Sequence, residues 1–132
     1  MSKPLFMSPE HVRLMNERLA GDVASKSACA ALPRRYQLAY RLEDGERVVW
    51  WTTVFDPAGG VRFHLAPPEG DADLQFSGSY WAMIEFTQRS KQGDAGSFPL
   101  TTGGDLNTYA IIMPAFAAAQ AAATLDTEFP AR

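Results

Sequence analysis

The segment from Arg47 to Phe55 constrains the fold of this chain more than any other part of the sequence. It reads Arg-Val-Val-Trp-Trp-Thr-Thr-Val-Phe, and such β-branched and aromatic residues favour a strand. Successive side chains of a strand point to opposite faces of the sheet, so a strand with one solvent face alternates apolar and polar residues. This segment does not alternate. It therefore predicts either that both faces pack against protein, or that one packs while the other lines an apolar cavity.

Length and composition predict one globular domain over residues 1–132. The chain is 46% hydrophobic and 20% charged, and its length can support a core of its own. A net charge of −3 argues against a nucleic-acid surface. The single cysteine, Cys29, excludes an internal disulfide and, with no signal peptide evident, indicates a cytoplasmic protein. Residues 109–124 are too few and too alanine-rich to span a bilayer, so we expect no stable membrane insertion.

Capping and turn residues divide the chain into helices around a β-meander. Ser8-Pro9 is typical of a helix start, Asp44-Gly45 of a two-residue hairpin turn, and Pro114 should kink or divide the last helix. The expected helices cover residues 8–21, 22–31, 79–92 (or 77–92, with Ser77 as cap) and 105–124. The expected strands cover residues 35–42, 47–55, 61–65, 72–76 and, weakened by Pro99, 98–102.

Few residues offer reactive chemistry. The sequence has no HExxH, CxxC, GxSxG or GxGxxG spacing, so we expect no metal and no cofactor. Cys29 fits a small core residue. Glu85, Asp73 and His64 could transfer protons if they faced an apolar substrate, although each also fits an ordinary surface or edge position.

The large aromatic and methionine residues form a more suggestive group. They could simply fill a core, or they could line a cavity, where the flexible methionine side chain adapts to ligands of varied shape. The group comprises Trp50, Trp51, Phe55, Phe63, Trp81, Met83, Phe86, Tyr109, Met113 and Phe116.

The order of the expected elements resembles that of the sterol carrier protein 2 (SCP2) domain. In that family a short strand reading alanine-aspartate-apolar precedes a helix, and a Gly-Asp pair leads into the last helix. The matching residues are Ala72-Asp73-Leu74 and Gly104-Asp105-Leu106, and the tryptophan-rich strand also suits the family. The resemblance covers roughly residues 8–124. The chain departs from the family's glycine-lysine-leucine strand, having Phe98-Pro-Leu-Thr-Thr-Gly103 instead.

The resemblance implies an α+β domain in which helices cover a mainly antiparallel five-stranded sheet and enclose an apolar cavity. A lipid-like ligand (fatty acyl chain, acyl-CoA or sterol-like ring system) would bind there without covalent chemistry, so the expected protein is a carrier and not an enzyme. The residues implied as ligand-binding are Trp50, Phe55, Phe63, Met83, Phe86, Tyr109, Ile112, Met113 and Phe116.

Two other functions stay open at this point. The first is a small enzyme that uses Glu85, Asp73 or His64 on an apolar substrate. The second is an interaction domain with a filled core, such as an accessory subunit that binds a metabolic enzyme. Tyr80 and Trp81, near a helix start, could in addition support a homodimer.

Overall fold

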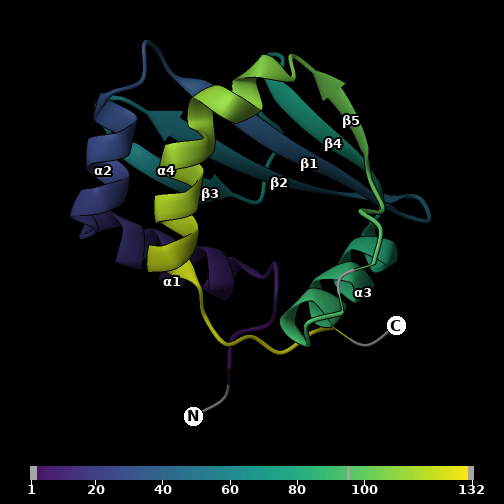
Figure 1. Ribbon diagram of the computed structural model, residues 1–132. Helices are drawn as coiled ribbons and strands as arrows, with labels where there is room; N and C mark the ends of the chain where they lie inside the picture. Colours follow the sequence, from purple (N-terminus) through teal and green to yellow (C-terminus); the bar gives the residue numbers. More distant parts are fainter. Residues whose placement is uncertain (1–2, 95, 131–132) are drawn as a thin grey trace.

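The computed structural model describes residues 3–94 and 96–130. Figure 1 shows the arrangement of the elements in these two ranges. In chain order they are α1 (Pro9–Ala20), α2 (Val23–Ala30), β1 (Tyr36–Asp44), β2 (Arg47–Asp56), β3 (Gly60–His64), β4 (Leu74–Ser79), α3 (Tyr80–Lys91), β5 (Thr101–Gly104) and α4 (Asn107–Ala123).

The five strands form one mixed sheet in the order β3-β2-β1-β4-β5. Strands β1, β2 and β3 are joined by antiparallel pairings, and β5 is antiparallel to β4. Strands β1 and β4 run parallel, with Leu38 opposite Leu74. The α+β class is confirmed, but the sheet contains one parallel pair. The reason is that the chain leaves β3 at one edge and returns on the far side of β1, which requires a crossover connection.

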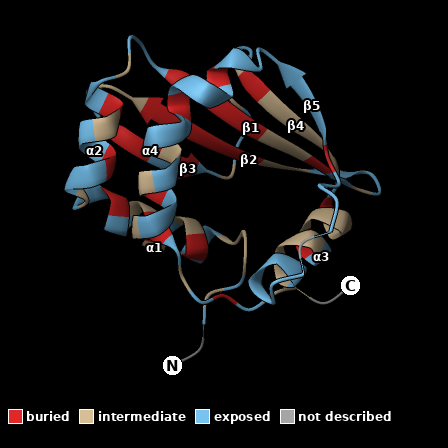
Figure 2. Ribbon diagram, in the orientation of Figure 1, coloured by how far each residue is buried: buried red, intermediate tan, exposed pale blue. Residues whose placement is uncertain are grey.

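The helices pack on one face of the sheet, which carries the core (Figures 1 and 2). Helices α1, α2 and α4 cover one half of this face, where Leu38, Phe55 and Ile112 are fully buried. Helix α3 covers the other end, where Tyr80 and Ile84 pack beside the strand residues. Caps define the starts of three helices: the side chains of Ser8, Asp22 and Ser79 each accept a hydrogen bond from a backbone N–H in the first turn.

The opposite face of the sheet is covered in part by the crossover segment, residues 65–73. Thr52 Oγ1 donates a hydrogen bond of 2.6 Å to the carbonyl oxygen of Ala66. The side chain of Gln37 bonds the backbone of Glu69 twice, donating at 2.8 Å and accepting at 2.9 Å. Both faces of β2 therefore contact protein, which explains why its residues do not alternate.

Two local expectations were wrong in detail. The hairpin turn is Gly45-Glu46 instead of Asp44-Gly45, because Asp44 pairs with Arg47 at the end of the ladder. Strand β5 begins three residues later than expected, since Pro99 has no N–H for the ladder, and it runs through the two glycines expected to turn. Pro114 lies inside α4 without dividing it.

Candidate functional site

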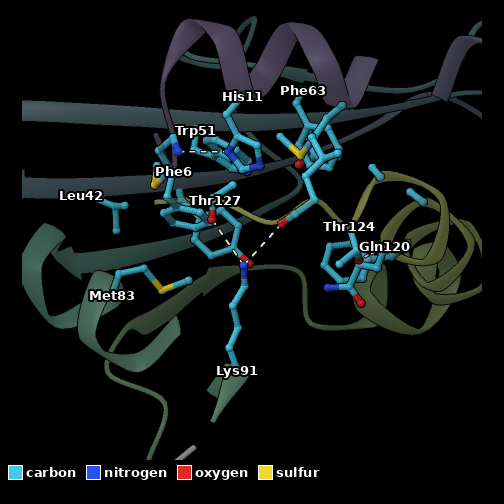
Figure 3. Close-up of a pocket in the computed structure, with 18 residues that line it drawn as sticks. Phe6, His11, Leu42, Trp51, Phe63, Met83, Lys91, Gln120, Thr124 and Thr127 are labelled. Atoms are coloured by element: carbon cyan, nitrogen blue, oxygen red, sulfur yellow. Dashed lines mark hydrogen bonds between the residues drawn. The ribbon is translucent and has the colours of Figure 1, made fainter. Parts of the chain in front are cut away.

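A pocket lies between the helix-bearing face of the sheet and helices α1, α3 and α4 (Figure 3). We call it the main pocket, and its volume is about 260 Å³. It is open to solvent on one side. The lining residues are Phe6, Met7, His11, Met15, Tyr40, Leu42, Trp51, Thr53, Phe63, Met83, Lys91, Phe116, Ala119, Gln120, Ala123, Thr124, Leu125 and Thr127.

Trp51 forms the aromatic floor of the main pocket. It points from β2 toward the helices, and only 8% of its surface is exposed. The centroid of its ring lies 6.1 Å from that of Phe6, 5.7 Å from that of His11 and 5.5 Å from that of Phe63. These rings come from the N-terminal segment, α1 and β3, so the floor exists only in the folded chain.

The two terminal segments form part of the pocket's rim. The backbone N–H of Phe6 donates to the carbonyl oxygen of Glu128 at 2.7 Å, and that of Glu128 donates to Pro4 at 2.9 Å. The rings of Phe6 and Phe129 lie 5.2 Å apart. A short parallel bridge thus holds residues 4–6 and 127–129 together beside the pocket.

A second hollow, which we call the side groove, adjoins the main pocket between α3 and α4. Its volume is about 530 Å³. The two share Tyr40, Met83, Phe116 and Gln120, so they meet at these side chains. The groove's other lining residues are Leu38, Leu74, Phe76, Phe86, Phe98, Thr102, Leu106 and Tyr109. The two hollows are thus neighbours over the sheet, and both are lined mainly by apolar side chains.

Two polar groups of the main pocket, His11 and the half-buried Tyr40, are held neutral. Burial, followed by the charge of Lys91, lowers the pKa of His11 to about 4. Its Nδ1 accepts a hydrogen bond of 3.1 Å from the backbone N–H of Met7, so the neutral ring carries its hydrogen on Nε2. Burial also raises the pKa of Tyr40 to about 12, an effect that the nearby Tyr109 reinforces.

Two further polar side chains of the main pocket differ in how they are satisfied. Lys91 Nζ, from the last turn of α3, donates to Thr127 Oγ1 at 3.3 Å and to the carbonyl oxygen of Leu125 at 3.5 Å (Figure 3). The hydroxyl of Thr53 is buried and has no hydrogen-bond partner in the described part of the chain. A buried hydroxyl without a partner costs free energy, so it marks a place where an additional acceptor or donor would be stabilising.

No family model matches this chain, and no curated protein matches its sequence. Several solved structures are nevertheless similar. One is the solution structure of a conserved hypothetical protein, possibly a sterol carrier protein, from Thermus thermophilus. It is 16% identical, the match covers 92% of each chain, and the TM-score is 0.52. A crystal structure of sterol carrier protein 2 is 17% identical over 89% of this chain and 94% of that one, with a TM-score of 0.49.

The chain has an SCP2-like fold. At sequence identities this low, the likeness shows the fold alone. It rests on the Thermus thermophilus protein, whose TM-score is 0.52. The two short segments that suggested this fold from the sequence are neighbours in space. Leu74 pairs with Gly104 across β4 and β5, and the backbone N–H of Asp105 donates to the carbonyl oxygen of Asp73 at 2.9 Å.

Asp73 itself has a structural role in this SCP2-like domain. Its Oδ2 accepts a hydrogen bond of 2.8 Å from the backbone N–H of Gln37, and its Oδ1 lies 2.9 Å from the guanidinium of Arg34. The carboxylate therefore joins the start of β1 to the start of β4. It lines neither the main pocket nor the side groove.

Five of the nine residues implied as ligand-binding line these two hollows. Phe63, Met83 and Phe116 line the main pocket. The side groove is lined by Met83 and Phe116 again, and also by Phe86 and Tyr109. They come from β3, α3 and α4, so the fold brings together residues that lie far apart in the sequence.

The other four lie elsewhere. Phe55 and Ile112 are fully buried in the core, where the Phe55 ring lies 6.3 Å from that of Phe116. Met113 is exposed on α4. Trp50 faces the other side of the sheet, where the Arg41 guanidinium lies 6.0 Å from its ring centroid and a separate hollow opens beside Pro67 and Pro68.

Sequence reasoning missed several lining residues, including Trp51, His11 and Lys91. Parity along β2 could have found Trp51, because Phe55 was expected inside and Trp51 lies four residues earlier, on the same face. Lys91 ends an amphipathic helix, a position where a cation is common for reasons unrelated to binding. The contributions of the two terminal segments had no local signal.

The proposed proton-transfer residues do not approach these hollows. Glu85 is exposed and forms an ion pair of 2.8 Å with Arg89 on the same helix. His64 is exposed on β3. In the described ranges, no group of three His, Cys, Asp or Glu residues could hold a metal, and no helix is both long and apolar enough to cross a membrane.

Proposed function

We propose that this protein is a non-enzymatic carrier that binds a lipid-like molecule in the main pocket and the side groove. The observation that carries the proposal is the adjacency of two mainly apolar hollows, which share Tyr40, Met83, Phe116 and Gln120. Ligand sites commonly measure about 300–1,000 Å³, so the main pocket is small alone and suits an elongated ligand when the groove extends it.

The chemistry of the lining supports an apolar ligand. Aromatic and aliphatic side chains from the sheet face those from α3 and α4, and burial of ligand surface contributes about 25 cal/mol per Å² before ordering costs. The SCP2-like fold supports the same class, since the similar Thermus protein is described as possibly a sterol carrier. Glu85, Asp73 and His64 lie outside both hollows, which favours binding over proton-transfer chemistry.

A direct test begins with the protein as purified. Native mass spectrometry, followed by solvent extraction, should reveal a bound lipid at about one per chain. After lipid removal, cis-parinaric acid should bind saturably, and the fluorescence of this polyene should rise on transfer from water.

A matched pair of tryptophan substitutions locates the binding. Met83→Trp places a large ring where the main pocket and the side groove meet, and it should reduce binding at least about tenfold. Val23→Trp adds the same ring at a position on α2 that is 75% exposed, and it should leave binding unchanged. Saturable binding that survives Met83→Trp unchanged in a folded protein would remove the proposal.

A further inference from the structure

Among the residues that the structure describes, Lys91 is the single side chain lining the main pocket or the side groove that is charged at neutral pH. Within residues 3–94 and 96–130, no aspartate, glutamate or arginine lines either hollow. His11, the other basic residue in the lining, is neutral because its pKa is lowered to about 4. Two mainly apolar hollows thus carry one positive charge, at the end bordered by the C-terminal segment.

Lys91 has no anionic partner among the described residues. Its Nζ lies 3.3 Å from Thr127 Oγ1 and 3.5 Å from the carbonyl oxygen of Leu125, and both acceptors are neutral. The ring of Phe129 lies 5.2 Å away and shields one side of the ammonium. An ammonium has three donors, and pairs with charged oxygen are shorter and stronger than these contacts. A carboxylate would therefore be a better partner than the groups now present.

Neutral hydrogen-bonding groups on the other walls of the main pocket add to this polarity. The hydroxyl of Thr53, which is 1% exposed, has no partner in the described part of the chain. His11 directs its Nδ1 to the backbone of Met7, which leaves Nε2–H as a donor. His11 and Lys91 lie close enough that the lysine's charge lowers the histidine's pKa. Lys91, His11 and Thr53 lie in the main pocket alone, whereas the polar groups of the side groove are the hydroxyls of Tyr40, Thr102 and Tyr109 and the amide of Gln120.

We propose that the bound lipid carries a single carboxylate, that Lys91 binds it beside Leu125 and Thr127, and that the hydrocarbon chain runs into the side groove. This inference rests on the proposed function and names the class and direction of its ligand. A coenzyme A ester carries several phosphate charges and would need more cations than one lysine. A lipid alcohol would offer Lys91 only another neutral oxygen, so the site should distinguish acid from alcohol.

The experiment compares three C12 ligands on the full chain after lipid removal. Lauric acid, 1-dodecanol and lauroyl-CoA are titrated at pH 7.5, with tryptophan fluorescence reporting through Trp51 and calorimetry as a second measurement. We expect the wild type to bind lauric acid at least about tenfold more tightly than 1-dodecanol or lauroyl-CoA, in keeping with the strength of hydrogen bonds to charged groups.

Variants at Lys91 test the assignment. Lys91→Met keeps the length of the side chain and should abolish the preference for lauric acid over 1-dodecanol, while Lys91→Arg should keep it. Lys26→Met, on α2, removes a lysine that lines neither hollow and should behave as wild type. Thermal unfolding establishes that each variant is folded.

The outcomes separate the two proposals. If the wild type binds none of the three ligands, the proposed function fails, and this inference fails with it. If acid and alcohol bind equally, or if folded Lys91→Met keeps the preference, the carboxylate inference is overturned while the carrier function stands. Tighter binding of lauroyl-CoA than of lauric acid would also overturn it.

Discussion

Trp50 and Trp51 are consecutive in β2 and lie on opposite faces of the sheet. Trp51 packs against Phe6, His11 and Phe63 under the helices, whereas Trp50 lies beside Arg41 on the face that the crossover segment partly covers. One strand thus supplies the floor of the main pocket and, one residue away, part of an unrelated surface. The two residues should therefore respond very differently to substitution.

We expect Trp51→Ala to lower the free energy of unfolding by about 3–5 kcal/mol, as is typical of large aromatic residues removed from a core. Its side chain is nearly buried among three other rings, which leaves a cavity that they cannot easily fill. Trp50→Ala should cost about 1 kcal/mol, because Trp50 is only half-buried. Urea denaturation followed by circular dichroism measures both, and equal losses would contradict the assignment of the two faces.

Thr52 and Thr53 form a second neighbouring pair with opposite expectations. Both are 1% exposed, but Thr52 donates to Ala66, whereas the Thr53 hydroxyl has no partner in the described ranges. Thr52→Val should lower the free energy of unfolding by about 1–2 kcal/mol because it breaks the bond that tethers the crossover segment. Thr53→Val should leave the ligand-free protein as stable as wild type, or more stable by up to about 1 kcal/mol.

Chemical denaturation of the lipid-free variants tests this pair, since the two substitutions have the same size and shape. A loss of more than about 1 kcal/mol in Thr53→Val would show that its hydroxyl is satisfied in solution.

Much of the fold could be predicted because its signals are local. Ser8, Asp22 and Ser79 cap helices as expected, and the two short segments ending at Leu74 and Leu106 occupy neighbouring positions. The parallel pairing of β1 and β4 could not be predicted, because it depends on where the chain crosses the sheet and not on any residue pattern within either strand. The end of β5 was misplaced for a related reason: its two glycines are held by pairing with β4, which local turn propensity does not describe.

The site was less predictable than the fold. Alternation along a strand shows which side chains share a face of the sheet, but not which face lies under the helices. Trp50 was therefore chosen as a ligand-binding residue, whereas Trp51 lines the pocket. Phe6, Thr127 and Lys91 meet only because the two terminal segments pair across the end of the domain. Contacts between residues more than a hundred positions apart leave no periodic trace in a single sequence.

His11 should make the stability of the protein depend on pH. Its pKa is lowered to about 4 in the folded state, chiefly by burial, while the ordinary value in an unfolded chain is 6.5. Between these values the unfolded chain binds a proton at His11 and the folded chain does not. The free energy of unfolding should therefore fall as the pH drops from about 6.5 to 4, by at most about 1.4 kcal/mol per pH unit from this group.

The difference between wild type and His11→Phe isolates this effect, because the acidic groups contribute equally to both proteins. Denaturation at several pH values from 4 to 8 should give a difference that is constant above pH 7 and changes below 6.5, as the wild type loses stability. His64→Phe, at an exposed position, is the control and should retain the wild-type slope. Parallel curves for wild type and His11→Phe would contradict a buried neutral histidine.

Gly104, at the junction of the two short segments, should tolerate no side chain. Its φ is +91°, and a Cβ there would lie 2.5 Å from the carbonyl oxygen of Asp73, which also accepts the N–H of Asp105. Gly104→Ala should cost at least about 2 kcal/mol, because it combines a left-handed backbone with a contact to rigid main chain. Gly103→Ala meets nothing nearer than 4.0 Å and should change stability by less than about 0.5 kcal/mol. Thermal and urea unfolding of the two variants compare adjacent positions in one strand, and similar losses at both would mean that the approach of β5 to Asp73 is looser than the structure shows.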